Sequence, residues 1–431
     1  MRLPAPAFQP PAPGQWTLQE EDGDTRTRGG PMRAVTWQGT EDVQVREVPD
    51  PGIERPTDAV VEVTSTAICG SDLHLYSPLG MFMEAGDILG HEAMGVVREV
   101  GSEAGRLRPG DRVVMPFNIS CGSCHMCERG CYAQCETTQV REYGKGAALF
   151  GYTKLYGHVP GGQAEYLRVP QAQFGPIRVP EGPPDERFLF LSDVLPTAWQ
   201  AVAFADVPPG GSVAVVGLGP IGQMAARIAR HQGAGRVFGL DSVPERLAMA
   251  ERHGVAAVDT GAEDDPAALV RDRTEGRGPD SVIDAVGMEA HGAPLGKAAQ
   301  TMASLLPDGV AEKLVARAGV DRMAALHLSF DLVRRCGTVS ISGVYGGQAD
   351  PLPMLDLFDK GVQIRMGQAH VRRWTDDILP LLTDADSDPL GVDDLTTHVV
   401  PLDQAPEAYE KFQHKRDGAI KMVLRPGARA A

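Results

Sequence analysis

The sequence predicts an α/β protein that combines a β-rich domain with a doubly wound parallel sheet. The chain has 431 residues, which is too long for one small core and suits two or three domains. Between Val35 and Val169, short β-branched runs are interrupted by proline and glycine, as in irregular β structure. From about Thr197 onward, apolar strands alternate with helices, which is typical of a parallel sheet covered on both faces.

The predicted elements follow one another in a consistent order along the chain. Residues 1–31 are rich in proline and lack a continuous apolar stretch, so we expect a flexible N-terminal arm before a first strand at Met32. The later expected elements are helices at 197–207, 375–384 and 405–413, apolar strands at 281–287, 337–346 and 419–426, and a long, mostly helical connection at 291–335.

Charge and cysteine content exclude several classes of partner. The formal net charge is −16, and so acidic a chain repels nucleic acid and anionic lipid. No run of about eighteen apolar residues occurs, and the N-terminus does not resemble a secretory signal. We therefore expect a cytoplasmic protein that binds neither nucleic acid nor membrane. Seven cysteines are an odd number in a large chain, which favours metal binding over disulfides.

A glycine-rich turn lies in the segment VAVVGLGPIG, between an apolar strand and a predicted helix. Gly217, Gly219 and Gly222 form a GxGxxG pattern, with Pro220 and Ile221 inside it. In such a turn one glycine makes the bend, one lets a pyrophosphate approach the backbone, and one lets helix and strand pack closely. The pattern in this context predicts a dinucleotide site. A structural strand-to-helix turn without a ligand is the alternative.

An acidic residue follows the turn at the expected distance. Asp241 ends the next predicted strand, 24 positions after Gly217. A carboxylate at this place binds ribose hydroxyls and repels a 2′-phosphate, so NAD is favoured over NADP. The alternative is that Asp241 caps the helix that follows it.

Five of the seven cysteines lie in the fifteen-residue stretch CGSCHMCERGCYAQC. Four soft thiolates at such spacing wrap one tetrahedral Zn²⁺, and a closed shell of this kind stabilises a loop without catalysing. Cys131 and His125 are spare donors in the same loop and are alternatives for one ligand. The four expected ligands of this structural zinc are Cys121, Cys124, Cys127 and Cys135.

A second metal site is predicted from residues that lie apart in the sequence. Cys69 occurs in AICGSDLHLY, and His91 and Glu92 occur in GHEAMG. No cysteine lies between the cysteine cluster and the glycine-rich turn, so Asp193 in LSDVLPTAW is the candidate third ligand. One Cys, one His and one Asp would neutralise Zn²⁺ and leave a fourth position open, as catalysis requires. Glu92 is an alternate or supporting ligand; a buried thiol, a core histidine and a helix cap are the alternatives.

These motifs together resemble the zinc-containing medium-chain dehydrogenase/reductase superfamily, of the alcohol dehydrogenase type. The resemblance covers residues 32–425 in the family's order, and within the superfamily the chain is most similar to glutathione-independent formaldehyde dehydrogenases. The segment after SGVYGG looks shorter than in those enzymes. The matching motifs are CGSDLH, GHEAMGVV, GDRVV, CGSCHMC, GGQAEY, LSDVLPTAW, GLGPIG, RMGQAHV and DGAIKMVL.

The resemblance implies a fold and a set of roles. It implies a GroES-like catalytic domain over 32–195, to which 367–431 return, and a Rossmann domain over 196–366. It implies two zinc ions per chain, NAD, and a homodimer or homotetramer. Ser71 and His74 match a proton relay that ends at a surface imidazole. The residues that match nicotinamide contacts are Thr197, Val286 and Val344.

The function implied is transfer of a hydride between a small alcohol or aldehyde hydrate and nicotinamide, with formaldehyde or a short aldehyde as candidate substrate. A polyol or secondary-alcohol dehydrogenase of the same superfamily is one alternative. A nucleotide-binding structural protein without activity is another. Residues that line the substrate pocket or else pack in the core are Leu73, Tyr76, Phe117 and Trp199.

Overall fold

The computed structural model describes residues 31–77, 80–287, 323–345 and 352–428. Almost all of the predicted N-terminal arm and most of the predicted helical connection at 291–335 lie outside these residues. The segment after SGVYGG, which the sequence indicates is short, is also mostly outside them. In the described part, no single helix is long and apolar enough to cross a membrane, although the bent pair Asp185–Ser192 and Val194–Ala205 passes by length and composition.

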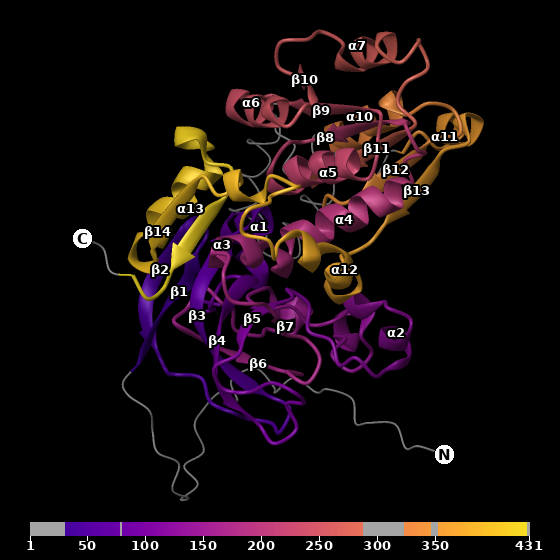
Figure 1. Ribbon diagram of the computed structural model, residues 1–431. Coiled ribbons are helices and arrows are strands. Elements are labelled where there is room, and N and C mark those ends of the chain that lie inside the picture. Colours follow the sequence, from indigo (N-terminus) through magenta and orange to yellow (C-terminus); the bar gives the residue numbers. More distant parts are fainter. Residues whose placement is uncertain (1–30, 78–79, 288–322, 346–351, 429–431) are drawn as a thin grey trace, which may run out of the picture.

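The β-rich part of the molecule is a seven-stranded sheet with a small two-stranded ribbon beside it (Figure 1). The sheet has the order β14-β15-β3-β4-β5-β7, and β6 pairs with β3 outside this path. The ribbon consists of β1 (Met32–Gly39) and β2 (Asp42–Val48). The strands of the sheet are β3 (Ala59–Ile68), β4 (Glu92–Val100), β5 (Arg112–Met115), β6 (Tyr166–Val169), β7 (Ile177–Arg178), β14 (His398–Pro401) and β15 (Met422–Arg425).

The second sheet is parallel throughout and has the order β10-β9-β8-β11-β12-β13. This order reverses direction between β8 and β11, and that switch point is where such sheets bind ligands. The α/β class predicted from the sequence is therefore confirmed. The strands are β8 (Ser212–Val216), β9 (Arg236–Asp241), β10 (Ala256–Asp259), β11 (Ser281–Asp284), β12 (Thr338–Ile341) and β13 (Gln363–Met366).

Side chains of the parallel strands alternate between two cores, as the period of two in a strand requires. Val213 and Val215 of β8 face the core that contains α4 and α5, whereas Ala214 and Val216 face the core of α7 and α10. Both faces of the sheet are thus covered, which explains its nearly continuous apolar strands. The main helices here are α4 (Val194–Ala205), α5 (Pro220–His231), α6 (Pro244–Arg252), α7 (Pro266–Asp272), α10 (Ala324–Leu332) and α11 (Met354–Lys360).

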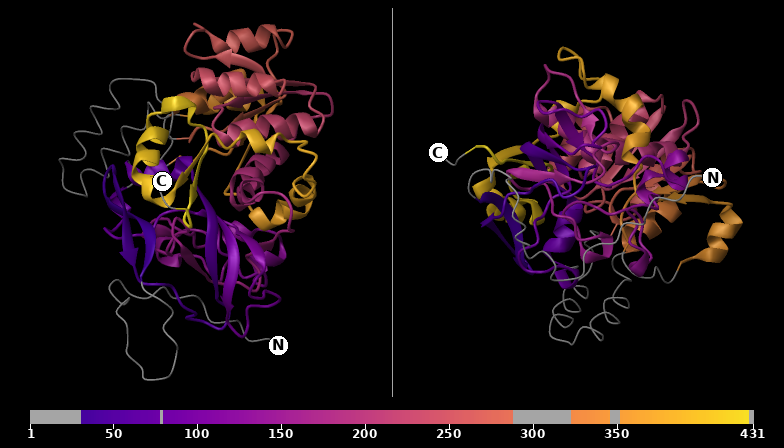
Figure 2. Two further views of the ribbon diagram at one scale, coloured as in Figure 1. Left: turned by 60° about the vertical axis from the view of Figure 1, so that its left-hand side comes forward. Right: turned by 90° about the horizontal axis from the view of Figure 1, so that it is seen from below.

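The C-terminal part of the chain returns from the parallel sheet to the β-rich sheet (Figures 1 and 2). After β13, helix α12 (Val371–Ile378) packs against α4. The chain then forms β14, α13 (Ala405–Gln413) and β15, and β15 pairs antiparallel with β3. This pairing brings the last strand next to the strand that precedes Cys69. The shorter helices are α1 (Gly70–Tyr76), α2 (His125–Glu128) and α3 (Asp185–Leu189).

Short 3₁₀ turns complete the connections between these elements. They are found at Gly80–Phe82, Tyr132–Gln134, Arg141–Tyr143, Lys154–Tyr156, Phe190–Ser192, Leu379–Leu381, Val392–Asp394, Leu402–Gln404 and Arg416–Gly418.

Candidate metal centres and dinucleotide site

Strand pairing places Cys69 and His91, the first two residues of the second predicted metal site, close together. Strands β3 and β4 are antiparallel neighbours, and Ala67 lies opposite Glu92 in their register. Cys69 follows the end of β3, and His91 precedes the start of β4. The two side chains therefore leave the same end of the sheet. Cys69 also occupies the N-cap position of α1 with an extended backbone.

Asp193 reaches the same place from a different part of the chain. It is the residue before α4, the helix that leads into the parallel sheet. Its Oδ2 lies 3.5 Å from Cys69 Sγ and 3.5 Å from His91 Nε2. Donor atoms of Cys69, His91, Glu92 and Asp193 all lie within 4.8 Å of one another. All four residues are buried, so one thiol, one imidazole and two carboxyl groups converge with little access to bulk water.

The buried carboxylate of Asp72 lies beside Nδ1 of the His91 ring, the nitrogen that does not face the donor cluster. Asp72 Oδ1 lies 3.0 Å from His91 Nδ1, which leaves Nε2 facing Asp193 and Cys69. Asp72 Oδ2 accepts a hydrogen bond from the Cys69 backbone N–H at 2.9 Å and from Gln163 Nε2 at 3.3 Å. The contact between Asp72 and His91 is an ion pair and not a hydrogen bond, because neither Asp72 Oδ1 nor His91 Nδ1 has a hydrogen-bond partner among the described residues. A carboxylate beside the second ring nitrogen is the usual neighbour of a metal-binding histidine.

The network around Asp72 continues into the C-terminal helix. Tyr409 of α13 donates its hydroxyl hydrogen to Gln163 Oε1 at 2.8 Å, and both side chains are fully buried. Tyr409 also packs against the ring of Tyr76 of α1, with 5.5 Å between ring centroids. The last part of the chain thus supports the helix that carries Asp72.

Glu92 has a cationic partner that is as deeply buried as itself. Lys421 Nζ lies 2.5 Å from Glu92 Oε1 and donates to the Ile68 carbonyl at 3.2 Å. Both side chains have no exposed surface. Burial opposes the charge on Lys421, but the nearby carboxylates outweigh it and raise the pKa of this amine. Glu92 Oε2 has no hydrogen-bond partner among the described residues, so one oxygen remains available beside the donor cluster.

The donor set is better suited to binding a divalent cation than to holding protons on Cys69 and His91. Burial, with the charges of Asp193 and Glu92, raises the pKa of the Cys69 thiol to about 11. Burial also opposes the charge on His91, but Asp72 and Asp193 outweigh it and raise the pKa of the imidazole. A bound cation would reverse both effects, because metal ligands are thiolate and neutral imidazole. Sulfur, nitrogen and oxygen donors of this mixture suit Zn²⁺.

The two proton-relay candidates lie on the same short helix, α1. Ser71 is half-buried, and its Oγ is 3.2 Å from His91 Nε2, directly beside the donor cluster. His74 is buried at 6 % exposure, so the expectation that it is a surface imidazole is wrong. The reason is that α1 has only seven residues and lies against the domain, which buries Leu75 and Tyr76 as well.

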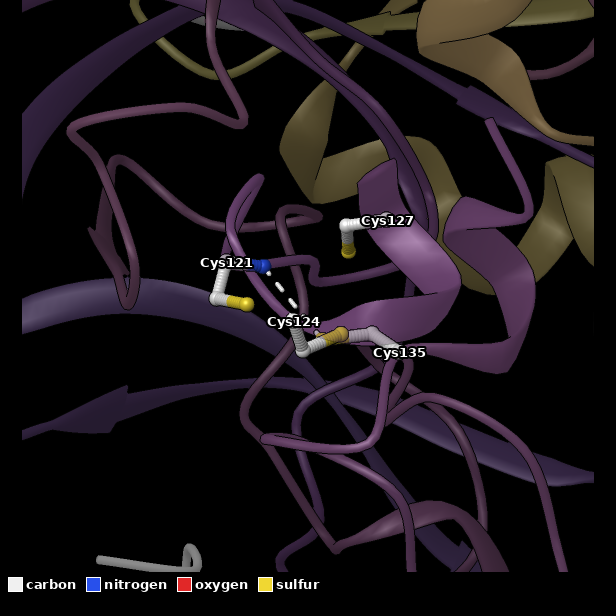
Figure 3. A group of neighbouring side chains, drawn as sticks. All are labelled: Cys121, Cys124, Cys127 and Cys135. Carbon is white, nitrogen blue, oxygen red and sulfur yellow. Dashed lines mark hydrogen bonds between the residues drawn. The ribbon is translucent and has the colours of Figure 1, made fainter. Parts of the chain in front are cut away.

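The cysteine cluster forms a separate centre in the loop that contains α2 (Figure 3). Its four sulfur atoms lie within 4.8 Å of one another, and Cys124 Sγ and Cys135 Sγ are 3.9 Å apart. Sulfurs arranged in a tetrahedron around zinc at ~2.3 Å would be ~3.8 Å apart. The spare donors take no part, because His125 is exposed beside Arg129 and Cys131 contacts a backbone carbonyl. The four sulfurs that face one another are those of Cys121, Cys124, Cys127 and Cys135.

Hydrogen bonds from the loop backbone further suit these sulfurs to the thiolate form. The Cys121 N–H donates to Cys135 Sγ at 3.4 Å, and the Glu136 N–H donates to Cys124 Sγ at 3.3 Å. Thr137 Oγ1 donates to Cys121 Sγ at 3.1 Å. Hydrogen bonds between the thiols, from Cys127 above all, lower the pKa of Cys121, and the same contacts with Cys121 raise the pKa of Cys127 and of Cys135.

The glycine-rich turn connects β8 to α5 at the switch point of the parallel sheet. Gly217 has φ of +85°, a conformation that glycine adopts without strain. A Cβ at Gly222 would lie 1.8 Å from the Gly217 carbonyl oxygen, so this position admits only glycine. A Cβ at Gly219 would meet only the Arg246 guanidinium, at 3.9 Å. Pro220 and Ile221 begin α5, and Pro220 takes the first helical position, where no N–H is needed.

Asp241 lies at the end of β9, next to this turn. Its Oδ2 accepts a hydrogen bond from the Leu218 N–H at 2.7 Å, and its Oδ1 accepts from Ser242 N and Val243 N at 2.7 and 3.0 Å. Val243, and not Asp241, is the N-cap residue of α6. Arg246 Nη1 is 3.5 Å from Asp241 Oδ2, so a guanidinium accompanies the carboxylate at the turn.

The remaining candidate cofactor contacts lie along the same edge of the parallel sheet or beside the donor cluster. Val286 follows β11, and its side chain lies next to Gly217. Val344 follows β12, is 49 % exposed and lies against Gly287. Thr197 of α4 donates its hydroxyl hydrogen to Asp193 Oδ1 at 2.5 Å, which connects it to the donor cluster.

Comparisons with known proteins agree with this arrangement. Residues 55–180 match the alcohol dehydrogenase GroES-like domain, and residues 220–304 match the zinc-binding dehydrogenase family. The chain is 40% identical to an uncharacterised zinc-type alcohol dehydrogenase-like protein of Bacillus subtilis, over 92% of this chain and 100% of that protein. The chain belongs to the zinc-type alcohol dehydrogenase family. Its cofactors are zinc and a nicotinamide dinucleotide.

Two further members of the family are similar along almost the whole chain. Formaldehyde dismutase of Pseudomonas putida is 34% identical over 91% of this chain and 97% of that protein. The structure of an alcohol dehydrogenase from Thermus sp. ATN1 has a TM-score of 0.74 and 35% identity, and it covers 91% of this chain and 99% of that one. The superfamily predicted from the sequence motifs is therefore confirmed.

Four residues were expected either to line the substrate pocket or to pack in the core, and one of them lies near the donor cluster. The Phe117 ring is 6.3 Å from the His91 ring, edge to face. Tyr76 is buried in a core with Tyr409, and Leu73 and Trp199 are half-buried against core clusters. Tyr152 was not foreseen from the sequence, although its ring lies 6.4 Å from His91.

Other residues that support the donor cluster of this dehydrogenase were also not predicted from the sequence. Asp72 lies inside the motif CGSDLH, three residues after Cys69. This position could have indicated that Asp72 supports the donor cluster. The pairings of Gln163 with Tyr409 and of Glu92 with Lys421 span 246 and 329 residues of sequence. No local pattern indicates contacts over such separations.

We predict that Lys421→Met destabilises the protein by ~3–5 kcal/mol, because it leaves the Glu92 carboxylate buried without its cation. Thermal or urea unfolding would measure the loss. The double variant Lys421→Met with Glu92→Gln removes both charges and is expected to recover much of it. Equal stability of the single variant and the natural chain would contradict the ion pair.

Proposed function

We propose that this chain oxidises a small primary alcohol or aldehyde hydrate with NAD, at a zinc ion held by Cys69, His91 and Asp193. The convergence of the three donor atoms within 4.8 Å, from three separate segments, is the observation that carries the proposal. The thiolate and the carboxylate supply two negative charges, which balance one Zn²⁺. Glu92 pairs with Lys421 and is therefore proposed as a supporting residue that retains one oxygen for the ion. The cysteine cluster is proposed to hold the second, structural zinc.

The chain's own residues support this chemistry by position. When bound, zinc supplies Lewis acidity that lowers the pKa of a hydroxyl or polarises a carbonyl, and nicotinamide supplies the hydride carrier. Asp72 holds the His91 ring, so that Nε2 faces the ion. Ser71 Oγ, beside the donor cluster, accepts the substrate hydroxyl proton and passes it toward His74, three residues later on the same face of α1. Burial of the donor cluster excludes water and strengthens each electrostatic contact.

A short, weakly polar substrate is supported by the surroundings of His91. The rings of Phe117 and Tyr152 lie within 6.4 Å of the His91 ring, where a polyol would need hydrogen-bonding partners for its extra hydroxyl groups. A relative named formaldehyde dismutase covers almost the whole chain. We therefore propose formaldehyde hydrate or a short alcohol as the substrate. Because zinc-binding thiols must stay reduced, the cytoplasm is the proposed compartment.

Asp193→Ala is expected to abolish turnover and to lower bound zinc from two ions to one per chain, while the fold survives. Metal analysis alongside NADH formation with formaldehyde and with primary, secondary and polyhydric alcohols measures both effects. Cys124→Ser is the matched control, since it would release the other ion and first lower thermal stability. An Asp193→Ala enzyme that keeps two zinc ions and its activity would exclude this residue as a ligand.

The cofactor preference is proposed to depend on the charge balance between Asp241 and Arg246. Asp241→Asn keeps the size of the side chain but removes the charge that repels a 2′-phosphate and attracts Arg246. The ratio of kcat/KM for NADP to that for NAD should rise about tenfold or more, because a charged hydrogen bond to the phosphate replaces a repulsion. The double variant with Arg246→Gln should lose most of this gain. An unchanged ratio in Asp241→Asn would refute the assignment.

We further propose that the chain forms a homo-oligomer through the free edge of the parallel sheet. Strand β13 is the outer strand of that sheet, and Ile364 and Met366 on it are 42 % and 65 % exposed. On the neighbouring α11, Leu355 and Phe358 are 73 % and 82 % exposed. A second copy related by a two-fold axis would pair with this edge and cover these side chains, since an isologous interface uses the same surface twice.

Phe358→Glu should convert the oligomer to a monomer, because two copies of the new carboxylate would be buried in the interface. Size-exclusion chromatography with light scattering measures the mass. Val399→Glu is the control, because Val399 is an exposed apolar residue on β14, away from this edge. A natural chain that runs as a monomer, or a Phe358→Glu variant that stays associated, would disprove this interface.

A further inference from the structure

A hollow of about 440 Å³ lies where the chain returns from the parallel sheet to the β-rich domain. It is bounded by the loop before β5, the loop before β7, and the first turn of α12. Its volume is within the range of small-molecule sites in proteins. None of the metal-binding or dinucleotide residues described above lines it, so its occupant would be distinct from substrate and cofactor.

Three arginines line this hollow, and none of the described residues lining it is acidic. They are Arg106, Arg178 and Arg372. The net charge of the chain is −16, whereas the three guanidinium groups make the charge around this hollow positive. The nearest carboxylate to Arg178 is Asp111, at 3.9 Å, and no described carboxylate lies within 4 Å of Arg106 or Arg372. The positive charge of the hollow is therefore largely uncompensated within the described residues.

Arg372 is the most enclosed of the three. Its Nε is buried and has no hydrogen-bond partner among the described residues. Burial, only partly offset by Asp376, lowers the pKa of this guanidinium. Its Cζ lies 5.3 Å from the centroid of the Phe174 ring, so the planar group is held over an aromatic face. The Nε–H of Arg372 therefore lacks the acceptor that a buried donor normally has.

The aromatic wall of the hollow packs against the cysteine loop. Phe174 packs against Gly122 of the cysteine loop, where any Cβ would lie 2.3 Å from the ring. The Tyr132 ring lies 5.1 Å from the Phe174 ring on the same side. The Gln173 amide also lines the hollow and donates to the Cys121 carbonyl at 3.5 Å. The wall of the hollow thus packs directly against the loop that carries the four-cysteine centre.

We propose that this hollow is a binding site for a small phosphate monoester, with Arg372, Arg178 and Arg106 on the phosphate and Phe174 against an apolar or planar remainder. Guanidinium groups bind phosphate through paired hydrogen bonds, and three of them match a dianion better than a single carboxylate. An aromatic face beside the charges favours an organic phosphate over the free ion. The strongly negative chain disfavours a nucleic-acid backbone as the source of the phosphate.

The test is titration calorimetry of the zinc-loaded enzyme with phenyl phosphate, inorganic phosphate and phenol at low ionic strength. Phenyl phosphate is expected to bind once per chain with a Kd of about 1 mM or tighter, and to raise the unfolding temperature by mass action. Inorganic phosphate should bind more weakly at the same site, and phenol should not bind there. Inorganic phosphate binding as tightly as the ester would overturn the proposed contact with Phe174.

Variants separate this site from the metal and dinucleotide sites. Arg372→Gln should weaken phenyl phosphate binding about tenfold, and Arg178→Gln by a smaller factor, since the Arg178 side chain is 54% exposed. Arg373→Gln removes an exposed charge from the next position of α12, and Arg246→Gln tests binding at the glycine-rich turn; neither should change the Kd by more than about twofold.

No saturable binding, or equal losses in Arg373→Gln or Arg246→Gln, would overturn the proposal. If Arg372→Gln fails to fold, the exposed Arg106 and Arg178 can be replaced together, and unchanged binding in that double variant would be equally decisive against the site.

Discussion

The pairing register of β3 and β4 is the constraint on which the catalytic part of this structure depends. Because Ala67 lies opposite Glu92, the residues that follow one strand and precede the other must meet at one end of the sheet. A slip of one residue would turn His91 to the other face. The register is fixed by buried apolar residues on both strands, such as Val61 and Val97. The convergence of the donor atoms proposed to hold zinc is therefore a consequence of how the β-rich core packs.

Charge balance is the second condition that the site satisfies. Four acidic or thiol groups and one imidazole lie together with little or no exposed surface, which is costly unless each charge is compensated. Lys421 compensates Glu92, and His91 lies between Asp72 and Asp193. A cation among Cys69, His91 and Asp193 would neutralise the remaining thiolate and carboxylate. The same reasoning explains why a lysine is buried completely in this core.

Helix α4 connects the two chemical centres. It begins at the residue after Asp193, and its Thr197 binds the Asp193 carboxylate. Its inner face packs against the parallel sheet in the same core as β8 and α5, the elements on either side of the glycine-rich turn. One helix thus fixes the position of a proposed metal ligand relative to the dinucleotide turn. This continuity is expected to matter for hydride transfer, because reacting atoms must be held within a few tenths of an ångström.

The sequence by itself determined the α/β class, the glycine-rich turn and the four clustered cysteines, because each depends on residues close together in the chain. It also singled out Cys69, His91 and Asp193 by motif, but only the tertiary structure brought their donor atoms together. Two supporting contacts, between Lys421 and Glu92 and between Tyr409 and Gln163, join segments hundreds of residues apart. The burial of His74 and the arginine-lined hollow were likewise decided by packing. Local spacing fixes turns and nearby ligands, whereas burial and long-range pairing depend on which strands and helices meet.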